Sequence, residues 1–143
     1  MIAKNPKEAI DAILKLTGWH PDVSANGKMR VELDAGVLEF FAPNELYLIL
    51  RQEVLHLPED EFEALQKCRE AAKINAGLAK LSRNRIVLEQ NSLILEQVLT
   101  LIDLNESHID EIFEDFLNNI DYIKNKIISN NGAVQFSPLN FLV

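Results

Sequence analysis

Few side chains in this sequence have the types and the spacing that catalysis or metal binding requires. The three histidines stand far apart, at positions 20, 56 and 108. His108 and Glu111 are three residues apart on an expected helix, a spacing at which two side chains can share a metal ion, but no second pair of ligands accompanies them. The sequence therefore predicts neither a metal site nor any other cofactor.

The other reactive groups also have a structural explanation. Cys68 is the single cysteine, so no disulfide can form within the chain, and its place in a helical pattern is typical of a small buried hydrophobic residue. The acidic run Glu59–Glu61 stands where a helix begins, and the helix dipole stabilises negative charge there. No nucleophile elbow, phosphate-binding loop or dinucleotide fingerprint occurs. We therefore expect no enzyme; a small hydrolase that uses His56 or His108 is the enzymatic alternative.

Composition and charge restrict the class of protein. The 143 residues suit one domain, and 48% hydrophobic with 25% charged residues is ordinary globular composition. The net charge of −8 would repel phosphate backbones and anionic lipid but attract a basic protein segment. We therefore expect no nucleic-acid partner and no membrane insertion. With no signal peptide at the start and no apolar run of the roughly 18 residues that a membrane span needs, we expect a cytoplasmic protein.

The first half of the chain predicts a helix followed by three strands. Apolar spacing is helical over Pro6–Thr17, with a proline at the first helical position and Gly18 just after the end. A loop over Trp19–Lys28 follows. Hydrophobic residues then alternate with polar ones in three strands at 29–34, 37–42 and 46–57. Short turns at Ala35-Gly36 and Pro43-Asn44 indicate an antiparallel meander.

The second half predicts a helix, a hairpin and a long final helix. Helical spacing covers Asp60–Leu81, and Ser107-x-x-Asp110 resembles a capping box before a helix that runs to Ile128. Strands at 85–89 and 92–99 flank a turn at Gln90-Asn91, although a helix over 85–102 also fits the composition. We expect residues 1–128 to form one domain and residues 129–143 a flexible C-terminal tail, because Asn130-Asn131-Gly132 interrupts the pattern.

The middle helix is rich in small residues in its second half. Small side chains let another backbone approach closely, and that backbone could belong to the sheet or to a second copy of the helix. We favour the second copy, and hence a homodimer. The residues expected at the dimer interface are Leu65, Cys68, Ala72, Ala76 and Ala79.

Several short segments match the pattern of a known family in their order along the chain. They are Leu16–Gly18, Val31–Leu33, Leu48–Leu50, Leu57–Asp60, Ala72, Asn75–Gly77, Ser92–Gln97, Leu101 and Leu104. The chain thereby resembles the class I type III secretion chaperones, the Tir-chaperone-like family of bacterial injectisomes, from about Ala9 to Ile128. The loop that begins Trp19-His20-Pro21 and the apolar tail depart from the family pattern.

This resemblance implies an α+β fold of the order α-β-β-β-α-β-β-α and a homodimeric, cytoplasmic bacterial chaperone. Such a protein binds an N-terminal segment of a secreted effector, keeps it non-globular and soluble, and delivers it to the secretion-system ATPase. By the same resemblance, the first helix, the sheet and the later hairpin would line effector-binding grooves. The expected groove residues are Ile10, Ile13, Leu14, Met29, Val31, Leu33, Leu93 and Leu95.

A second class of function also fits the acidic composition. An immunity or inhibitor protein would bind a folded basic partner and abolish that partner's activity, whereas the client of an export chaperone stays unfolded in the complex. The folding state of the bound partner therefore discriminates between the two classes.

Overall fold

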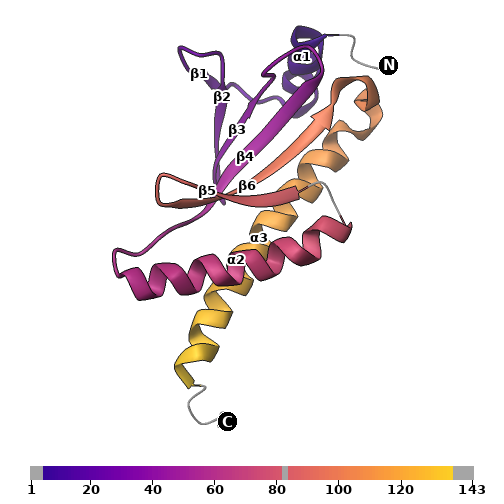
Figure 1. The fold of residues 1–143 in the computed structure, drawn as a ribbon. Helices are drawn as coiled ribbons and strands as arrows, with labels where there is room; N and C mark the ends of the chain where they lie inside the picture. Colours follow the sequence, from indigo (N-terminus) through magenta and orange to yellow (C-terminus); the bar gives the residue numbers. More distant parts are fainter. Residues whose placement is uncertain (1–4, 82–83, 137–143) are drawn as a thin grey trace.

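The elements follow one another in the order helix, four strands, helix, two strands, helix (Figure 1). The computed structural model describes residues 5–81 and 84–136, with side chains for 5–78 and 84–128. The helices are α1 (Pro6–Thr17), α2 (Glu61–Leu81) and α3 (Glu106–Phe136), with a 3-10 turn, η1 (Leu101–Asp103). The strands are β1 (Asp22–Val23), β2 (Met29–Leu33), β3 (Gly36–Phe41), β4 (Tyr47–His56), β5 (Asn84–Glu89) and β6 (Ser92–Thr100). The predicted α+β fold is confirmed.

Local side-chain chemistry fixes both ends of α1. The Asn5 side chain accepts a hydrogen bond from the backbone N–H of Glu8 (2.9 Å), and Pro6 occupies the first turn, where a helix needs no N–H. Gly18 has a φ of 74°, in the left-handed region, and its N–H donates to the carbonyl of Leu14. The predicted bounds of this helix are confirmed.

The described strands form one antiparallel sheet in the order β1-β2-β3-β4-β6-β5. Strand β1 lies within the segment that we expected to be a loop, where Asp22 pairs with Arg30 of β2. The turn between β2 and β3 is one position earlier than predicted, because Leu33 pairs with Gly36. The sheet therefore has one more strand than the sequence pattern indicates, and this strand lies at an edge. Its two residues are too few to show alternation.

The predicted hairpin between β5 and β6 is confirmed. Its two turn residues, Gln90 and Asn91, have φ values of 48° and 64°, and Glu89 pairs with Ser92. Positive φ at both central residues is the requirement of a type I′ turn, whose twist matches that of the flanking strands. The alternative of a continuous helix over 85–102 is wrong.

One face of the sheet, here called the inner face, is buried under α1 and α3. Leu38, Phe40, Leu48 and Leu50 are fully buried on this face. On α3 six side chains at helical spacing are at most 3% exposed: Ile109, Phe113, Phe116, Ile120, Ile123 and Ile127. Helix α1 packs against α3, which in turn contacts β4. The other face of the sheet, the outer face, is turned away from α3.

Trp19 attaches the loop after α1 to this core. Its ring centroid lies 6.3 Å from that of Phe40 and 5.3 Å from that of Phe113, and the Trp19–Phe113 pair is edge-to-face. Such aromatic pairs stabilise beyond the area that they bury. The segment that departs from the family pattern is therefore held in place by its tryptophan.

Helix α3 differs from the prediction at both ends. The Asn105 side chain accepts from the backbone N–H of Ser107 (3.1 Å), so Asn105 caps the helix and the predicted capping box at Ser107 is wrong. At the other end the backbone stays helical to Phe136, beyond the predicted end at Ile128. Residues 137–143 of the expected tail lie outside the described residues, and the division into a domain and a flexible tail stays a prediction.

No helix in the described parts of the chain is both long and apolar enough to cross a membrane.

Candidate protein-binding surfaces

A single row of charged side chains, here called the charge ladder, crosses the outer face of the sheet. The strand registers place its members directly opposite one another on neighbouring strands. From β1 to β5 across the sheet, the charges of these side chains alternate between negative and positive. The members, in that order, are Asp22, Arg30, Glu39, Arg51, Glu96 and Arg85.

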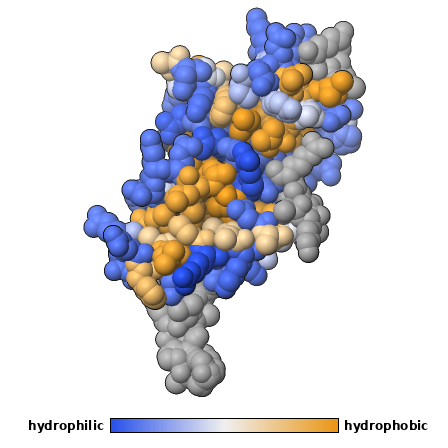
Figure 2. Space-filling model, viewed as in Figure 1, coloured by the Kyte–Doolittle hydropathy of each residue, from blue (hydrophilic) through white to orange (hydrophobic). Residues whose placement is uncertain are grey.

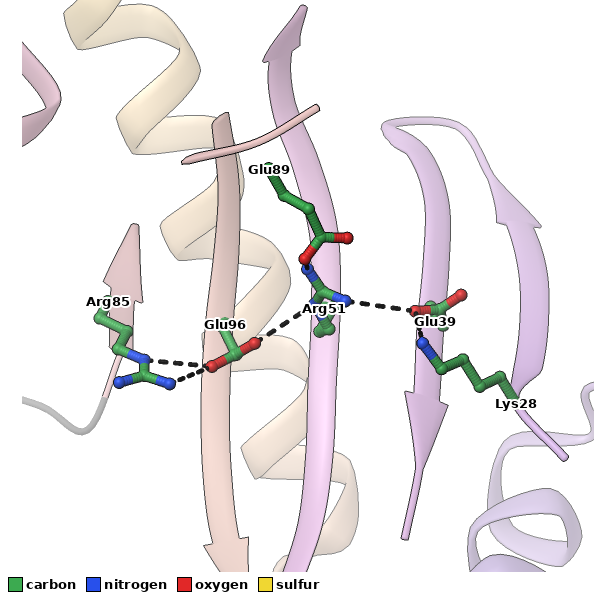
Figure 3. Close-up of polar contacts among 6 residues, drawn as sticks. All are labelled: Lys28, Glu39, Arg51, Arg85, Glu89 and Glu96. Carbon is green, nitrogen blue, oxygen red and sulfur yellow. Dashed lines mark hydrogen bonds and ion pairs between the residues drawn. The ribbon is translucent and has the colours of Figure 1, made fainter. Parts of the chain in front are cut away.

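Arg51 is the centre of the charge ladder (Figure 3). Its guanidinium lies 3.3 Å from Glu96 and 4.0 Å from Glu39 on the two neighbouring strands, and it donates to Glu89 at 2.6 Å. Glu96 also accepts from Arg85 at 2.6 Å. The side chains of Arg51 and Glu96 are only 11% and 12% exposed, so these charges are partly desolvated and must be paired.

Apolar side chains lie on both sides of the charge ladder. On one side Phe41, Ile49 and Val98 are directly opposite one another, and on the other side Ile94 is opposite Val87. These side chains are partly exposed because no element of the described chain covers the outer face. Figure 2 shows the result on the face in view, where two apolar areas are separated by a hydrophilic band and the lower area lies above α2.

Helix α2 presents a second uncovered surface. Phe62 and Leu65 are 65% and 48% exposed, and Ala72, Ala76 and Gly77 are exposed further along the helix. A Cβ atom at Gly77 would meet nothing within 4 Å. Most of the predicted dimer residues therefore share the outward side of α2; Cys68 packs towards the core, and the side chain of Ala79 lies outside the described residues.

Asn75 of α2 closes the outer edge of β5. Its side-chain amide donates to the carbonyl of Ile86 (2.8 Å), and its side-chain oxygen accepts from the N–H of Ile86 (2.6 Å). These two bonds, here called the Asn75 clamp, replace those that a further strand would make. An edge strand with unpaired backbone groups is a template for association, and covering it prevents unwanted pairing.

A buried lysine joins α2 to α3. Lys67 is 8% exposed, and its ammonium group donates to the carbonyl of Ile127 (3.2 Å). Burial lowers the pKa of Lys67, and the nearby charges of Glu63 and Glu70 oppose this shift. The inward side of α2 thus packs against the rest of the protein, and the outward side stays exposed and can contact another protein.

The predicted groove residues divide into two groups by burial. Four are buried in the core of the single chain and cannot present their side chains at its surface: Ile13, Val31, Leu93 and Leu95. The other four, Ile10, Leu14, Met29 and Leu33, pack against the core but stay partly exposed. Helix α1 packs against α3, and a groove that unites α1 with β2 stays a prediction.

One cluster contains residue types that hydrolases use. The Ser92 hydroxyl donates to Glu53, and the Nδ1 atom of His56 lies 3.2 Å from the Ser92 hydroxyl and 3.8 Å from Glu53. In a catalytic triad the histidine stands between the serine and the carboxylate and uses a different nitrogen for each. Here one nitrogen faces both groups and the serine contacts the carboxylate directly, so the arrangement does not activate a nucleophile. In the described parts of the chain no group of three or more His, Cys, Asp or Glu side chains is placed to hold a metal ion.

The sequence reasoning missed the charge ladder and the Asn75 clamp. Alternation assigns five of the ladder residues to outward positions of their strands, and Asp22 lies in the segment that was expected to be a loop. Only the registers bring the six residues into one row. Asn75 was noted only as part of a family-like segment.

Several solved structures share this fold, and two of them were solved as complexes. The Yersinia pestis type III secretion chaperone SycH, solved in complex with a stable fragment of YscM2, matches with a TM-score of 0.58 and 14% identity over 80% of this chain and 96% of that one. A chain of the ExsC–ExsE complex matches with a TM-score of 0.64 and 12% identity over 84% of this chain and 93% of that one. No protein-family model and no curated protein matches by sequence. The likenesses therefore establish the architecture of the chain.

Proposed function

We propose that this protein is a type III secretion chaperone that binds an N-terminal segment of a secreted effector in the bacterial cytoplasm. It keeps this segment non-globular and soluble and delivers it to the ATPase of the secretion apparatus. It acts as a homodimer, and it binds its client without catalysing a reaction.

One observation carries this proposal: the fold is that of two proteins solved in complexes, SycH with a fragment of YscM2 and ExsC with ExsE. The surface of this chain supports the same use. The outer sheet face and the outward side of α2 have apolar side chains that nothing in the described chain covers. A disordered client can lie along such surfaces, because it orders only when it binds.

For the effector we propose contacts with the partly exposed members of the predicted groove set, Ile10 and Leu14 on α1 and Met29 and Leu33 on β2. The buried members support these from below. The net charge of −8 favours the approach of a basic segment.

For the homodimer we propose the outward side of α2. Leu65 supplies apolar area, and the small residues Ala72, Ala76 and Gly77 let a second helix come close. Light scattering then gives twice the chain mass of 16.2 kDa. Ala72→Glu places a charge at the contact and is expected to give a monomer, whereas Ala25→Glu in the exposed β1–β2 loop leaves the dimer intact. A wild-type monomer at micromolar concentration contradicts the dimer.

The function is tested by co-expression with the protein encoded beside this gene. We expect a soluble complex of two chaperones and one client, in which the bound client segment is protease-sensitive and exchanges its amide hydrogens rapidly outside the contact. A client that stays folded and loses an enzymatic activity in the complex would instead identify an inhibitor. The absence of any complex would refute both functions.

A further inference from the structure

The sheet opens between β3 and β4 near the start of β3. Strand β3 pairs with β4 only from Leu38, which lies opposite Gln52, whereas its first residue, Gly36, pairs with β2. Strand β4 continues to His56 and pairs there with β6 on its other side. Among the described residues, positions 53–56 of β4 therefore have no strand partner on the β3 side.

The space between the two strands is a hollow of about 640 Å³, here called the β3–β4 hollow. Ala35, Gly36 and Val37 line one side, Lys124 of α3 also contributes, and the other side includes every residue from Arg51 to His56. Successive residues of a strand point to opposite faces, so a hollow that touches six in a row exposes the edge of β4 rather than one face. Its volume lies in the range of natural ligand sites.

A buried side chain in this hollow lacks one hydrogen bond. Gln52 is 2% exposed, and its amide nitrogen donates to the carbonyl of Ala35 (3.1 Å), which also accepts from Lys124 (2.5 Å). The side-chain oxygen of Gln52 has no donor among the described residues. Buried acceptors are nearly always paired, so an incoming group that donates to this oxygen would gain stability.

We propose that an extended segment of the client enters the β3–β4 hollow, pairs its backbone with residues 53–56 of β4 in line with β3, and donates to the side-chain oxygen of Gln52. This proposal rests on the proposed function, since it names where that client binds. Strand addition of this kind takes its affinity from main-chain hydrogen bonds.

Two further observations favour this edge and this chemistry. The edge of β5 is already closed by the Asn75 clamp, and β1 is only two residues long. At the rim of the hollow the carboxylate of Glu53 is 54% exposed, whereas Glu89 is paired with Arg51. The lining also includes Arg30 and Lys124, so the charge of the whole protein, −8, rather than that of the hollow, favours a segment with basic side chains on its outward face.

The probe for this site is the acetylated hexapeptide amide Lys-Val-Lys-Val-Lys-Val, added to the full-length protein. We expect NMR shift changes at the amides of residues 53–56 and at the side-chain amide of Gln52, and slower hydrogen exchange at positions 53–56. The same peptide N-methylated at alternate residues cannot pair as a strand, and we expect it to bind at least 10-fold more weakly. Equal binding of the two peptides, or shift changes confined to other strands, would overturn the proposal.

A matched pair of variants separates this site from the outer edge of the sheet. Val37→Trp fills the hollow from an exposed position, and Val23→Trp places the same side chain on β1. We expect at least a 10-fold loss of peptide and client binding for V37W and less than twofold for V23W. If V37W loses its native circular dichroism spectrum, Ala35→Trp replaces it. A client that co-purifies equally with wild type and V37W overturns this inference and leaves the proposed function standing, whereas the absence of any client on wild type refutes the function itself.

Discussion

Removal of the Asn75 clamp is the sharpest test of how this fold protects its sheet. In Asn75→Ala both hydrogen bonds to Ile86 disappear, at 2.8 and 2.6 Å, and the main-chain groups of a residue that is 6% exposed lose their partners. Each lost bond costs about 1 kcal/mol, and a buried group left unpaired costs about 1–3 kcal/mol. The higher helix propensity of alanine offsets roughly 0.5 kcal/mol of this loss. We therefore expect the free energy of unfolding to fall by about 2–3 kcal/mol.

The measurement is urea unfolding followed by circular dichroism, with hydrogen exchange at the Ile86 amide as a local readout. For a chain of this length the expected loss corresponds to a decrease in Tm of about 5–10 °C, and the Ile86 amide, which only Asn75 protects in the described structure, exchanges faster. Asn118→Ala is the matched control, because Asn118 is exposed on α3, and we expect it to change the free energy of unfolding by less than about 0.5 kcal/mol.

Asn75→Asp separates the two bonds of the clamp. A carboxylate can still accept from the Ile86 N–H but cannot donate to the Ile86 carbonyl, so at neutral pH this variant should be at least as unstable as Asn75→Ala. If Asn75→Ala unfolds within 0.5 kcal/mol of wild type and the Ile86 amide keeps its protection, the edge of β5 is closed by something other than this side chain, and our reasoning about sheet edges is wrong.

Three more predictions follow from single side chains. Arg51→Ala removes the guanidinium that contacts Glu39, Glu89 and Glu96, and it leaves the partly buried carboxylate of Glu96 with only the exposed Arg85, so it should lower the free energy of unfolding by about 2–3 kcal/mol. Arg85→Ala, at 65% exposure, should cost less than about 1 kcal/mol, and similar losses for the two variants in urea unfolding would contradict the central role of Arg51. For Lys67, burial lowers the folded-state pKa below the usual value of 10.5, so the unfolded chain binds more protons than the folded one at pH values between the folded pKa and 10.5. Within this window the free energy of unfolding of wild type should rise with pH relative to that of Lys67→Met, and below it the difference between the two proteins should be constant. A difference that stays constant through the window as well would refute this. Trp19→Ala should cost about 3 kcal/mol because it leaves a cavity between β3 and α3, and a thermal melt within about 2 °C of wild type would contradict this role.

Periodicity predicted the elements well because each reflects a local rule. The α1 helix has a cap, a proline and a glycine at the expected places, and the β5–β6 turn has residues that tolerate positive φ. The end of α3 was predicted too early, since Asn130-Asn131-Gly132 weakens a helix locally but does not prevent it. Local propensity is a weak prior that tertiary context overrides.

The binding surfaces were less predictable, because they depend on pairing between distant strands. Alternation assigns Arg51 and Glu96 to outward positions but does not say that they are opposite each other, 45 positions apart in the chain (96 − 51). The burial of single side chains is equally hard to predict from the sequence. Ile10 and Ile13 share one helical stripe, and only the packing of α1 against α3 makes Ile13 fully buried. Strand register and packing depend on the whole chain, so the local patterns of a single sequence do not predict them.

The distribution of charge supports a division of labour among the surfaces. Two copies of a chain with a net charge of −8 repel each other, so a contact between copies must use a region that is close to neutral. The charge ladder holds three acidic and three basic side chains and is neutral, and the outward side of α2 is apolar around Leu65 and Ala72. Exposed acidic side chains are frequent on α3, at Asp110, Glu111, Glu114, Asp115 and Asp121, and a second group stands at the start of α2, at positions 59, 60, 61 and 63. A second copy thus meets least repulsion along the later part of α2, around Ala72 and Ala76, where Arg69 and Lys73 are exposed. The field of α3 remains free to attract a basic client, and high salt should slow client association more than it weakens the dimer.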